Sequence, residues 1–231
     1  MNKLELNNNE LQNTLSKNSE GQFSESAAIV YQMNTQRIKN KASAFGFIST
    51  RSGEGTTYGA ISIFEALPQI LGKEVSAVLV DANINHADLS CQVGFPKRGW
   101  AHWLAVKKSY DIKDAVIPWK DTAGSGVLPV GANSGFIDKL PILQFVEVIS
   151  ALKTRFEFVL IDHQPFFCNN LSDQFCVGSD SVIIVLEAEK TRKFLVKKML
   201  EELQKMKIET LGSILNKRRY YIPQWLYERL F

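Results

Sequence analysis

The feature that most constrains the fold of this chain is a regular alternation of short apolar runs with segments of helical periodicity. The runs are AFGFIS, VSAVLVDA, GVLPV, FEFVLID, SDSVIIVLE and TLGSILN, which begin at positions 44, 75, 126, 156, 179 and 210. Helical patterns lie between them, at 57–72, 100–107, 137–154 and 189–207. Several runs are apolar on both faces, as in strands of a parallel sheet that helices cover on both sides. The alternation predicts an α/β fold with a single doubly wound, mostly parallel sheet.

The first residues of the chain depart from this pattern. Residues 1–23 are rich in Asn, Ser, Gln and Glu and hold few apolar side chains, which predicts a flexible polar arm. A Ser/Glu helix start at Ser24 opens the remainder of the chain. We expect residues 24–231 to form one domain, because a chain of this length can bury a full core.

Composition limits the compartment and the partners of the protein. The cysteines, Cys91, Cys168 and Cys176, show no C-x-x-C spacing, which is typical of reduced thiols in a cytoplasmic protein. The opening MNKLELNNNELQ lacks the apolar region of a signal peptide. No apolar run approaches the roughly 18–20 residues that span a bilayer. We therefore expect a cytoplasmic protein.

The charge of the chain is small and unevenly placed. A net charge of +3 does not by itself indicate a nucleic-acid partner, and we expect none. Residues 190–231 hold eleven Lys or Arg and four Asp or Glu. This basic end fits a solvated helix face, and it fits equally well a surface that meets phosphate, an anionic membrane or an acidic partner.

The stretch STRSGEGTTYGA, residues 49–60, has the position and composition of a phosphate-binding loop. It follows an apolar run and precedes a helical pattern, so it is expected to join a strand to a helix. Gly53 and Gly55 permit the curvature with which successive N–H groups point at one anion, and the start of a helix near Thr57 favours negative charge. The expected nucleotide-binding residues of the loop are Ser52, Gly53, Glu54, Gly55, Thr56, Thr57 and Tyr58. A strand-to-helix turn without a ligand is the alternative.

Polar side chains also follow the other apolar runs, where ligands bind in open α/β sheets. Thr57 stands where the hydroxyl of a P-loop binds Mg²⁺, and Asp162 stands where a Walker B aspartate holds that metal. The three histidines lack the spacing of metal ligands, and we expect them to be structural. His163 follows Asp162 directly, so we expect it to line the site without acting in it.

Four segments of the chain together resemble the bacterial tyrosine kinases, or BY-kinases, of capsule and exopolysaccharide synthesis. The segments are STRSGEGTTYGAISIFEAL, VLVDANINHADL, FEFVLIDHQP and LGSILNKRRYYIPQWLYERL. BY-kinases belong to the MinD/ParA-type P-loop ATPases. The resemblance runs from about Ser24 to the C-terminus, and it implies a P-loop NTPase-like domain over 24–231. It also implies ATP or ADP with Mg²⁺ as ligands and protein-tyrosine kinase activity.

The resemblance implies a role for each aspartate after a strand. Asp81 matches the first aspartate of the Walker A′ motif, which in the family helps to activate the tyrosine hydroxyl and to organise the metal. Asn83 replaces the second acid of that motif, and Asp162 matches the Walker B aspartate. Asp81 and Asp162 are therefore the implied catalytic residues, and together with Thr57 they are the implied Mg²⁺ ligands.

Further matches concern the nucleotide itself. Residues 53–58 match the Walker A loop, and Asn216 matches a position that contacts the nucleotide base, with Arg218 close by. The chief departure is Thr56, which stands at the position of the Walker A lysine. Losing that charge-assisted contact costs roughly 1.5–3 kcal/mol, or about one to two decades in affinity. Phosphoryl transfer is expected to suffer more, because charge stabilisation supplies most of its catalysis.

These departures predict a degenerate BY-kinase-like protein that binds ATP or ADP weakly and acts through partner contact more than through turnover. Two alternatives stay open. In the first, the chain is an active kinase in which Arg51, at the signature-lysine position of ParA-like proteins, reaches the phosphates of a partner subunit. In the second, it is a positioning ATPase of the MinD/ParA type. The C-terminal YYIPQWLYERLF favours the kinase branch.

The resemblance also implies partners. In the family a membrane-embedded adaptor of the chain-length-regulator type recruits the domain, which implies a peripheral location at the inner face of the membrane. A homo-oligomer stays open, but ring assembly of the family kind is not expected, because Ala28 and Tyr31 stand near the arginine positions of the family's oligomerisation motif. Tyr220, Tyr221 and Tyr227 resemble a C-terminal cluster of phosphorylated tyrosines, although packed aromatic residues of a terminal helix are the favoured interpretation.

Overall fold

A single sheet of seven strands forms the centre of the molecule. The computed structural model describes residues 21–41, 43–84, 86–120, 124–131, 142–168 and 176–218. The strands are β1 (Ala44–Ser49), β2 (Ala77–Ala82), β3 (Ile117–Pro118), β4 (Gly126–Leu128), β5 (Phe158–His163), β6 (Ser181–Glu187) and β7 (Glu209–Asn216). Their order in the sheet is β3-β4-β2-β5-β1-β6-β7, and every pair is parallel except β3–β4. The predicted α/β fold with a mostly parallel sheet is confirmed.

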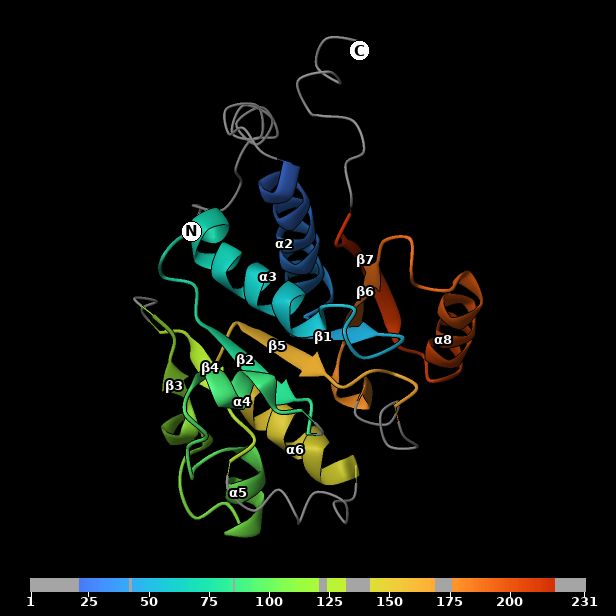
Figure 1. Ribbon diagram of the computed structural model, residues 1–231. Helices are drawn as coiled ribbons and strands as arrows, with labels where there is room; N and C mark the ends of the chain where they lie inside the picture. The colour runs from blue at the N-terminus through green and yellow to red at the C-terminus, as the bar shows by residue number, and fades with distance from the viewer. Residues whose placement is uncertain are drawn as a thin grey trace.

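Helices cover both faces of this sheet (Figure 1). The helices α2 (Gly21–Asn40) and α3 (Thr56–Leu71) lie on one face, whereas α5 (Trp100–Ala105), α6 (Ile142–Lys153) and α8 (Lys193–Lys205) pack on the other. Shorter turns complete the described chain: α4 (Asp88–Gln92), η1 (Ile112–Ala115) and η3 (Cys176–Gly178). Within the described ranges, no helix combines the length and the apolar character needed to cross a membrane.

The three strands at the centre of the sheet are buried along their whole length, which explains their nearly continuous apolar sequences. The core between one face of the sheet and the helices α2 and α3 includes the strand residues Phe45, Phe47, Leu79 and Leu160 and the helix residues Met33, Ile63 and Phe64. The core between the other face and the helices α5 and α6 includes the strand residues Val80, Val159 and Ile161 and the helix residues Trp100, Phe145 and Leu152. Burial of each such side chain stabilises the fold by roughly 1.5–3 kcal/mol. This core holds the ends of the strands in fixed positions.

Candidate phosphate-binding site

The loop between β1 and α3 has the backbone shape that its glycines predict. Gly53 and Gly55 have φ angles of 85° and 94°, in the left-handed region that glycine adopts at little cost. Gly55 is also required sterically, because a Cβ atom there would lie 1.9 Å from the side-chain nitrogen of Asn216. The end of β7 therefore packs directly against the loop.

The first turn of α3 offers hydrogen-bond donors at this loop. The helix begins at Thr56, and within the described residues the N–H groups of Gly55, Thr56 and Thr57 have no acceptor. Such unpaired donors, together with the positive end of the helix dipole, favour a bound anion. Ser52, Gly53 and Tyr58 are exposed around them. These exposed groups could bind an anion, and the phosphate cradle stays a prediction.

Glu54 turns its side chain into the protein, and its surface is only 1% exposed. Its carboxylate accepts hydrogen bonds from the N–H and hydroxyl groups of Thr50, both at 2.8 Å, and from the Thr191 hydroxyl at 2.8 Å. A fourth bond, of 3.3 Å, comes from the N–H of Arg51. Glu54 thus shapes the loop from within, and its backbone rather than its side chain remains to face a ligand.

Thr56, which the sequence resemblance matches to the Walker A lysine, is buried and bonded within the protein. Its hydroxyl donates to Ser49 Oγ at 2.7 Å, and Ser49 Oγ donates to the carbonyl of Arg51 at 3.1 Å. The loop therefore receives no cation from this position. The two hydroxyls instead tie the start of α3 to the end of β1.

Asp81 and Asp162 lie side by side at the ends of β2 and β5, where the strand register pairs them. Both oxygens of Asp81 are engaged: Oδ2 accepts from the N–H and hydroxyl of Ser90 at 2.8 and 2.6 Å, and Oδ1 accepts from the N–H of Asn83 at 3.1 Å. Burial raises the pKa of Asp81 above its usual range, although these bonds oppose the effect.

The hydrogen bonding of Asp162 differs from that of Asp81. It is fully buried, and neither of its carboxylate oxygens has a hydrogen-bond partner of good geometry in the described part of the chain. Burial raises the pKa of Asp162 to about 8, opposed in part by the Thr57 hydroxyl and reinforced by the charge of Asp81. A buried carboxyl group without hydrogen-bond partners is suited to ligate a cation.

The donor set fits a magnesium ion in part. Asp162 and Thr57 could hold Mg²⁺, whereas the oxygens of Asp81 already accept bonds from Ser90 and Asn83. No group of three or more His, Cys, Asp or Glu side chains in the described ranges is placed to bind a metal. Mg²⁺ would therefore depend on nucleotide oxygens and water for its remaining ligands, as it commonly does.

Three cations surround the loop, and two carboxylates balance them. Arg51 donates to the carbonyl of Lys190 at 2.9 Å, and its Nε lies 3.7 Å from Glu54 Oε1. Lys217, which follows β7, donates its Nζ to the carbonyl of Gly53 at 2.5 Å. The Nζ atoms of Lys190 and Lys217 lie 2.7 and 3.5 Å from the carboxylate oxygens of Glu187. The loop is thus enclosed by a charged ring of Arg51, Glu54, Glu187, Lys190 and Lys217.

The expectation that His163 lines the site is wrong. Side chains alternate along β5, so Leu160 and Asp162 face α3 whereas Ile161 and His163 face the opposite side of the sheet. There the ring of His163 is fully buried, 3.1 Å from the Ser179 hydroxyl. Burial lowers its pKa to about 3, so the imidazole is neutral at physiological pH.

The structure also shows where other predicted residues lie. Asn216 points its side chain at the loop and donates to the carbonyl of Glu54 at 2.9 Å, and Arg218 is exposed beyond it. Tyr220, Tyr221 and Tyr227 lie outside the described residues. Sequence reasoning missed Lys217, Thr191 and Ser90. The signal for Lys217 was its place directly after a strand that ends at the site.

Comparison with solved structures places the fold among bacterial tyrosine kinase domains and MinD/ParA ATPases. The VpsO kinase domain is similar with a TM-score of 0.67 and 20% identity, over 85% of this chain and 96% of that domain. The kinase domain of the Escherichia coli tyrosine kinase ETK gives 0.69 and 11%, over 83% and 74% of the two chains. MinD of Pyrococcus horikoshii, solved with Mg-ADP, gives 0.64 and 21%, over 81% and 76%.

The sequence matches no protein-family model and no curated protein sequence. The structural likeness therefore concerns the fold: the chain has the P-loop ATPase-like fold that BY-kinase domains share with MinD and ParA proteins. The resemblance that the sequence motifs indicate is confirmed at this level. The main feature of the site is a glycine loop with unpaired N–H donors at the start of α3 and a threonine at position 56.

Proposed function

We propose that this chain is a degenerate BY-kinase-like P-loop protein that regulates exopolysaccharide or capsule synthesis or export through contact with a partner. ATP turnover is weak or absent. The observation that carries the proposal is Thr56, which replaces the Walker A lysine and donates its hydroxyl to Ser49. The loop keeps the glycine geometry and the free donors of a phosphate site, but it has lost the cation that phosphoryl transfer requires.

The remaining residues support nucleotide binding better than chemistry. In a nucleotide complex the N–H groups of Gly55, Thr56 and Thr57 would bind phosphate oxygens, and Asp162 with the Thr57 hydroxyl would hold Mg²⁺. A bound Mg²⁺ would neutralise phosphate oxygens. Asp81 is a poor candidate for a catalytic base, because both of its oxygens already accept hydrogen bonds within the protein.

The partner in this proposal is a separate, membrane-embedded adaptor of the chain-length-regulator type, as in BY-kinases. Contact with it would hold the domain at the inner face of the membrane. In such an arrangement the nucleotide state of the loop would act through conformation. The family resemblance supports this part of the proposal.

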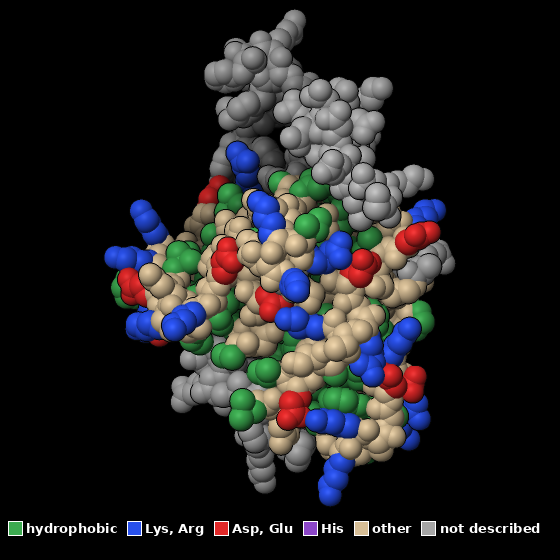
Figure 2. Space-filling model, turned by 180° about the vertical axis from the view of Figure 1, so that it is seen from behind, with side chains coloured by type: hydrophobic (Ala, Val, Ile, Leu, Met, Phe, Trp, Pro, Cys, Tyr) green, Lys and Arg blue, Asp and Glu red, His purple; other side chains and the backbone are tan. Residues whose placement is uncertain are grey.

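An active kinase that uses Arg51 in trans is the second candidate. The contacts of Arg51 argue against this candidate, because the guanidinium donates to the carbonyl of Lys190 and lies beside Glu54 in its own chain. A MinD/ParA-type positioning ATPase fits the fold equally well. On the face seen in Figure 2, however, Lys and Arg side chains are dispersed among Asp and Glu, which disfavours a nucleic-acid partner for that face.

Titration of the purified protein with ATP and ADP, with and without Mg²⁺, tests the proposal. We expect dissociation constants in the high micromolar range or weaker, an order-of-magnitude value that follows from the lost charge contact. We also expect no autophosphorylation of Tyr220, Tyr221 or Tyr227. Submicromolar binding, together with phosphotyrosine that Asp81→Ala abolishes, would show that the chain is an active kinase instead.

A further inference from the structure

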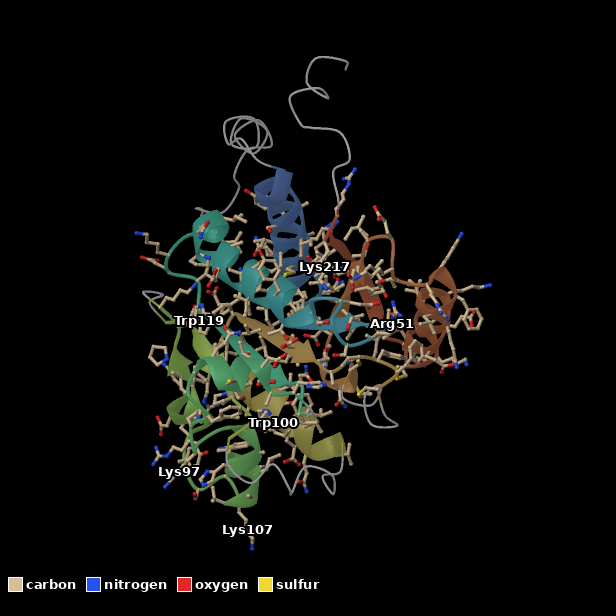
Figure 3. All side chains as sticks on the ribbon, in the orientation of Figure 1. Arg51, Lys97, Trp100, Lys107, Trp119 and Lys217 are labelled. Atoms are coloured by element: carbon tan, nitrogen blue, oxygen red, sulfur yellow. The ribbon has the colours of Figure 1, made fainter. Side chains whose placement is uncertain are left out.

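We propose that Lys217, contributed by the end of β7, is the cation that binds the nucleotide phosphates in place of the missing loop lysine. The proposal deepens the function proposed above and depends on a nucleotide occupying the same loop. Lys217 follows Asn216, the last residue of β7, and Figure 3 places it at the same end of the sheet as Arg51. The site is therefore completed from a strand distant in sequence.

The backbone of Lys217 directs its side chain to the loop. Its φ of 56° lies in the left-handed region, and its N–H donates to Asn216 Oδ1 at 2.8 Å. The amide of Asn216 in turn donates to the carbonyl of Glu54 at 2.9 Å. These bonds fix the turn after β7 to the glycine loop, so that the lysine side chain starts from a defined position beside it.

The ammonium group already contacts the loop. Lys217 Nζ donates to the carbonyl of Gly53, two residues before the unpaired N–H groups that begin at Gly55. A second, independent sign of a ligand lies at the same end of the sheet, where the fully buried carboxylate of Asp162 has no hydrogen-bond partner among the described residues. Phosphate oxygens with Mg²⁺ would supply partners for both the donors and this carboxylate.

Lys217 can move away from its present contacts without leaving the carboxylate of Glu187 unpaired. Its counter-ion Glu187, whose side chain is 10% exposed, is shared with Lys190. The Lys190 ammonium lies nearer, at 2.7 Å against 3.5 Å for Lys217, so Glu187 stays neutralised when Lys217 turns to a phosphate. The Lys217 side chain is 48% exposed and has a flexible four-carbon stem, which gives it the freedom to move.

The other cations of the loop are less suited to this role. Arg51 is bonded to the carbonyl of Lys190 and lies 3.7 Å from the buried Glu54, whose position depends on several other bonds. Moving Arg51 would leave that carboxylate without its nearby positive charge. Lys217 gives up one backbone carbonyl and a shared ion pair, which is the smaller loss.

Nucleotide titrations of the full chain test the proposal. Chemical-shift titrations with ATP, ADP and adenosine, which extend to millimolar dissociation constants, are compared for the unaltered protein, Lys217→Ala and Lys217→Arg. We expect Lys217→Ala to weaken ATP and ADP about tenfold, the lower end for a charge-assisted bond because the lysine is half exposed, and to leave adenosine unchanged. Lys217→Arg should retain most of the ATP affinity. Lys197→Ala, which removes the same charge from α8, is the control and should bind like the unaltered protein.

A second experiment combines Thr56→Lys and Lys217→Ala in a double-mutant cycle. In the Thr56→Lys background, Lys217→Ala should cause a smaller loss of ATP affinity, since both lysines would neutralise the same phosphate oxygens. An equal loss for adenosine, no loss for ATP, or no nucleotide binding by the unaltered protein would each overturn the role of Lys217. The last result would leave the partner-based function standing. Conversely, fast ATP turnover that depends on Lys217 would support its role in phosphate binding. The same result would contradict the proposal that ATP turnover is weak or absent.

Discussion

At the scale of single residues, Thr56 gives the glycine loop a hydroxyl where the sequence resemblance matches a lysine. A threonine hydroxyl stays close to its own backbone, and here it satisfies Ser49 rather than a ligand. A lysine at this position has a long stem and carries its charge away from the loop floor. A threonine at this position therefore places no charge at the loop, whose shape is held by the contacts of Glu54 and Asn216.

Restoring the lysine is the most direct test of this view. We predict that Thr56→Lys tightens ATP binding by about one to two decades, the size of one charge-assisted contact. Thr56→Ser keeps a hydroxyl for Ser49 without adding charge, so it should bind ATP as the unaltered protein does. Calorimetry measures both variants. An unchanged affinity in Thr56→Lys would mean that the loop is not a phosphate cradle.

The pH dependence of stability reports on Asp162. Burial raises the pKa of Asp162 from 3.8 to about 8 and lowers that of His163 from 6.5 to about 3. The pKa values of Asp162 and His163 in the unfolded chain are 3.8 and 6.5. Between these two pH values, the two pKa shifts change the free energy of unfolding in opposite directions as pH rises. Of these two groups, only Asp162 differs in protonation between the folded and unfolded states above pH 6.5: the folded protein keeps its proton, whereas the unfolded chain has lost it. The stability that this proton provides is present in full below pH 3.8 and is lost as pH rises through about 8.

We therefore predict that the free energy of unfolding falls between about pH 6.5 and pH 8, by at most about 1.4 kcal/mol per pH unit. Asp162→Asn should remove this slope, because an amide does not titrate. Urea unfolding at several pH values measures it, with His163→Asn as the control that should keep the slope above pH 6.5. The same slope in Asp162→Asn and the unaltered protein would contradict the assignment.

The residues of the site differ in how far sequence could predict them. Asp81 and Asp162 could be placed together because both end buried, parallel strands. The bonding of Asp81 could not, since Ser90 lies in α4 and only tertiary packing brings it to the carboxylate. For the same reason the role of Glu54 as an internal support, through Thr191, has no local signal.

At the scale of elements, the glycine loop is held by two neighbouring segments. Thr191, after β6, bonds the carboxylate of Glu54, and Asn216, at the end of β7, bonds its carbonyl. The loop therefore has its shape before any phosphate arrives. Preorganisation of this kind lowers the cost of binding a ligand.

Replacing Glu54 should disturb this support. We predict that Glu54→Ala lowers the free energy of unfolding by about 1–3 kcal/mol, because it leaves the buried donors of Thr50 without an acceptor. Glu54→Gln keeps one oxygen acceptor and should cost less. Urea unfolding measures both. A loss as large for the glutamine as for the alanine would show that charge, rather than hydrogen bonding, is what stabilises the loop.

The elements themselves could be predicted to different degrees. Strands buried on both faces produce long apolar runs, so six of the seven strands coincide with predicted runs. The strand β3 has two residues, too few for any periodicity. The helix expected at 100–107 ends at Ala105, because Lys107 and Lys108 take left-handed φ angles of 51° and 60° that cannot continue it.

At the scale of the whole molecule, the contacts of Arg51 bear on assembly. An arginine that serves a partner subunit would have to release the carbonyl of Lys190 and move away from Glu54. Its exposed contacts contribute little to stability. The structure therefore favours an Arg51 that belongs to its own subunit.

We predict that Arg51→Ala changes the free energy of unfolding and the nucleotide affinity by less than about 0.5 kcal/mol. Sedimentation velocity with and without ATP should show the same oligomeric state for the variant and the unaltered protein. ATP-dependent dimers that disappear in Arg51→Ala would instead establish the arginine in trans, and with it the active alternative.

The place of β1 in the sheet sets the order in which the molecule can form. β1 pairs with β5 and β6, whose sequences follow more than one hundred residues later, as the pairs Ala44–Val159 and Phe45–Ser181 show. Such long-range pairing slows folding, because the entropy of closing long loops is lost before the contacts between the strands stabilise the chain. The glycine loop is synthesised early, yet it gains Thr191 and Asn216 only when the last strands arrive. A ribosome that stalls before β6 thus releases a chain that carries the entire loop sequence and no site.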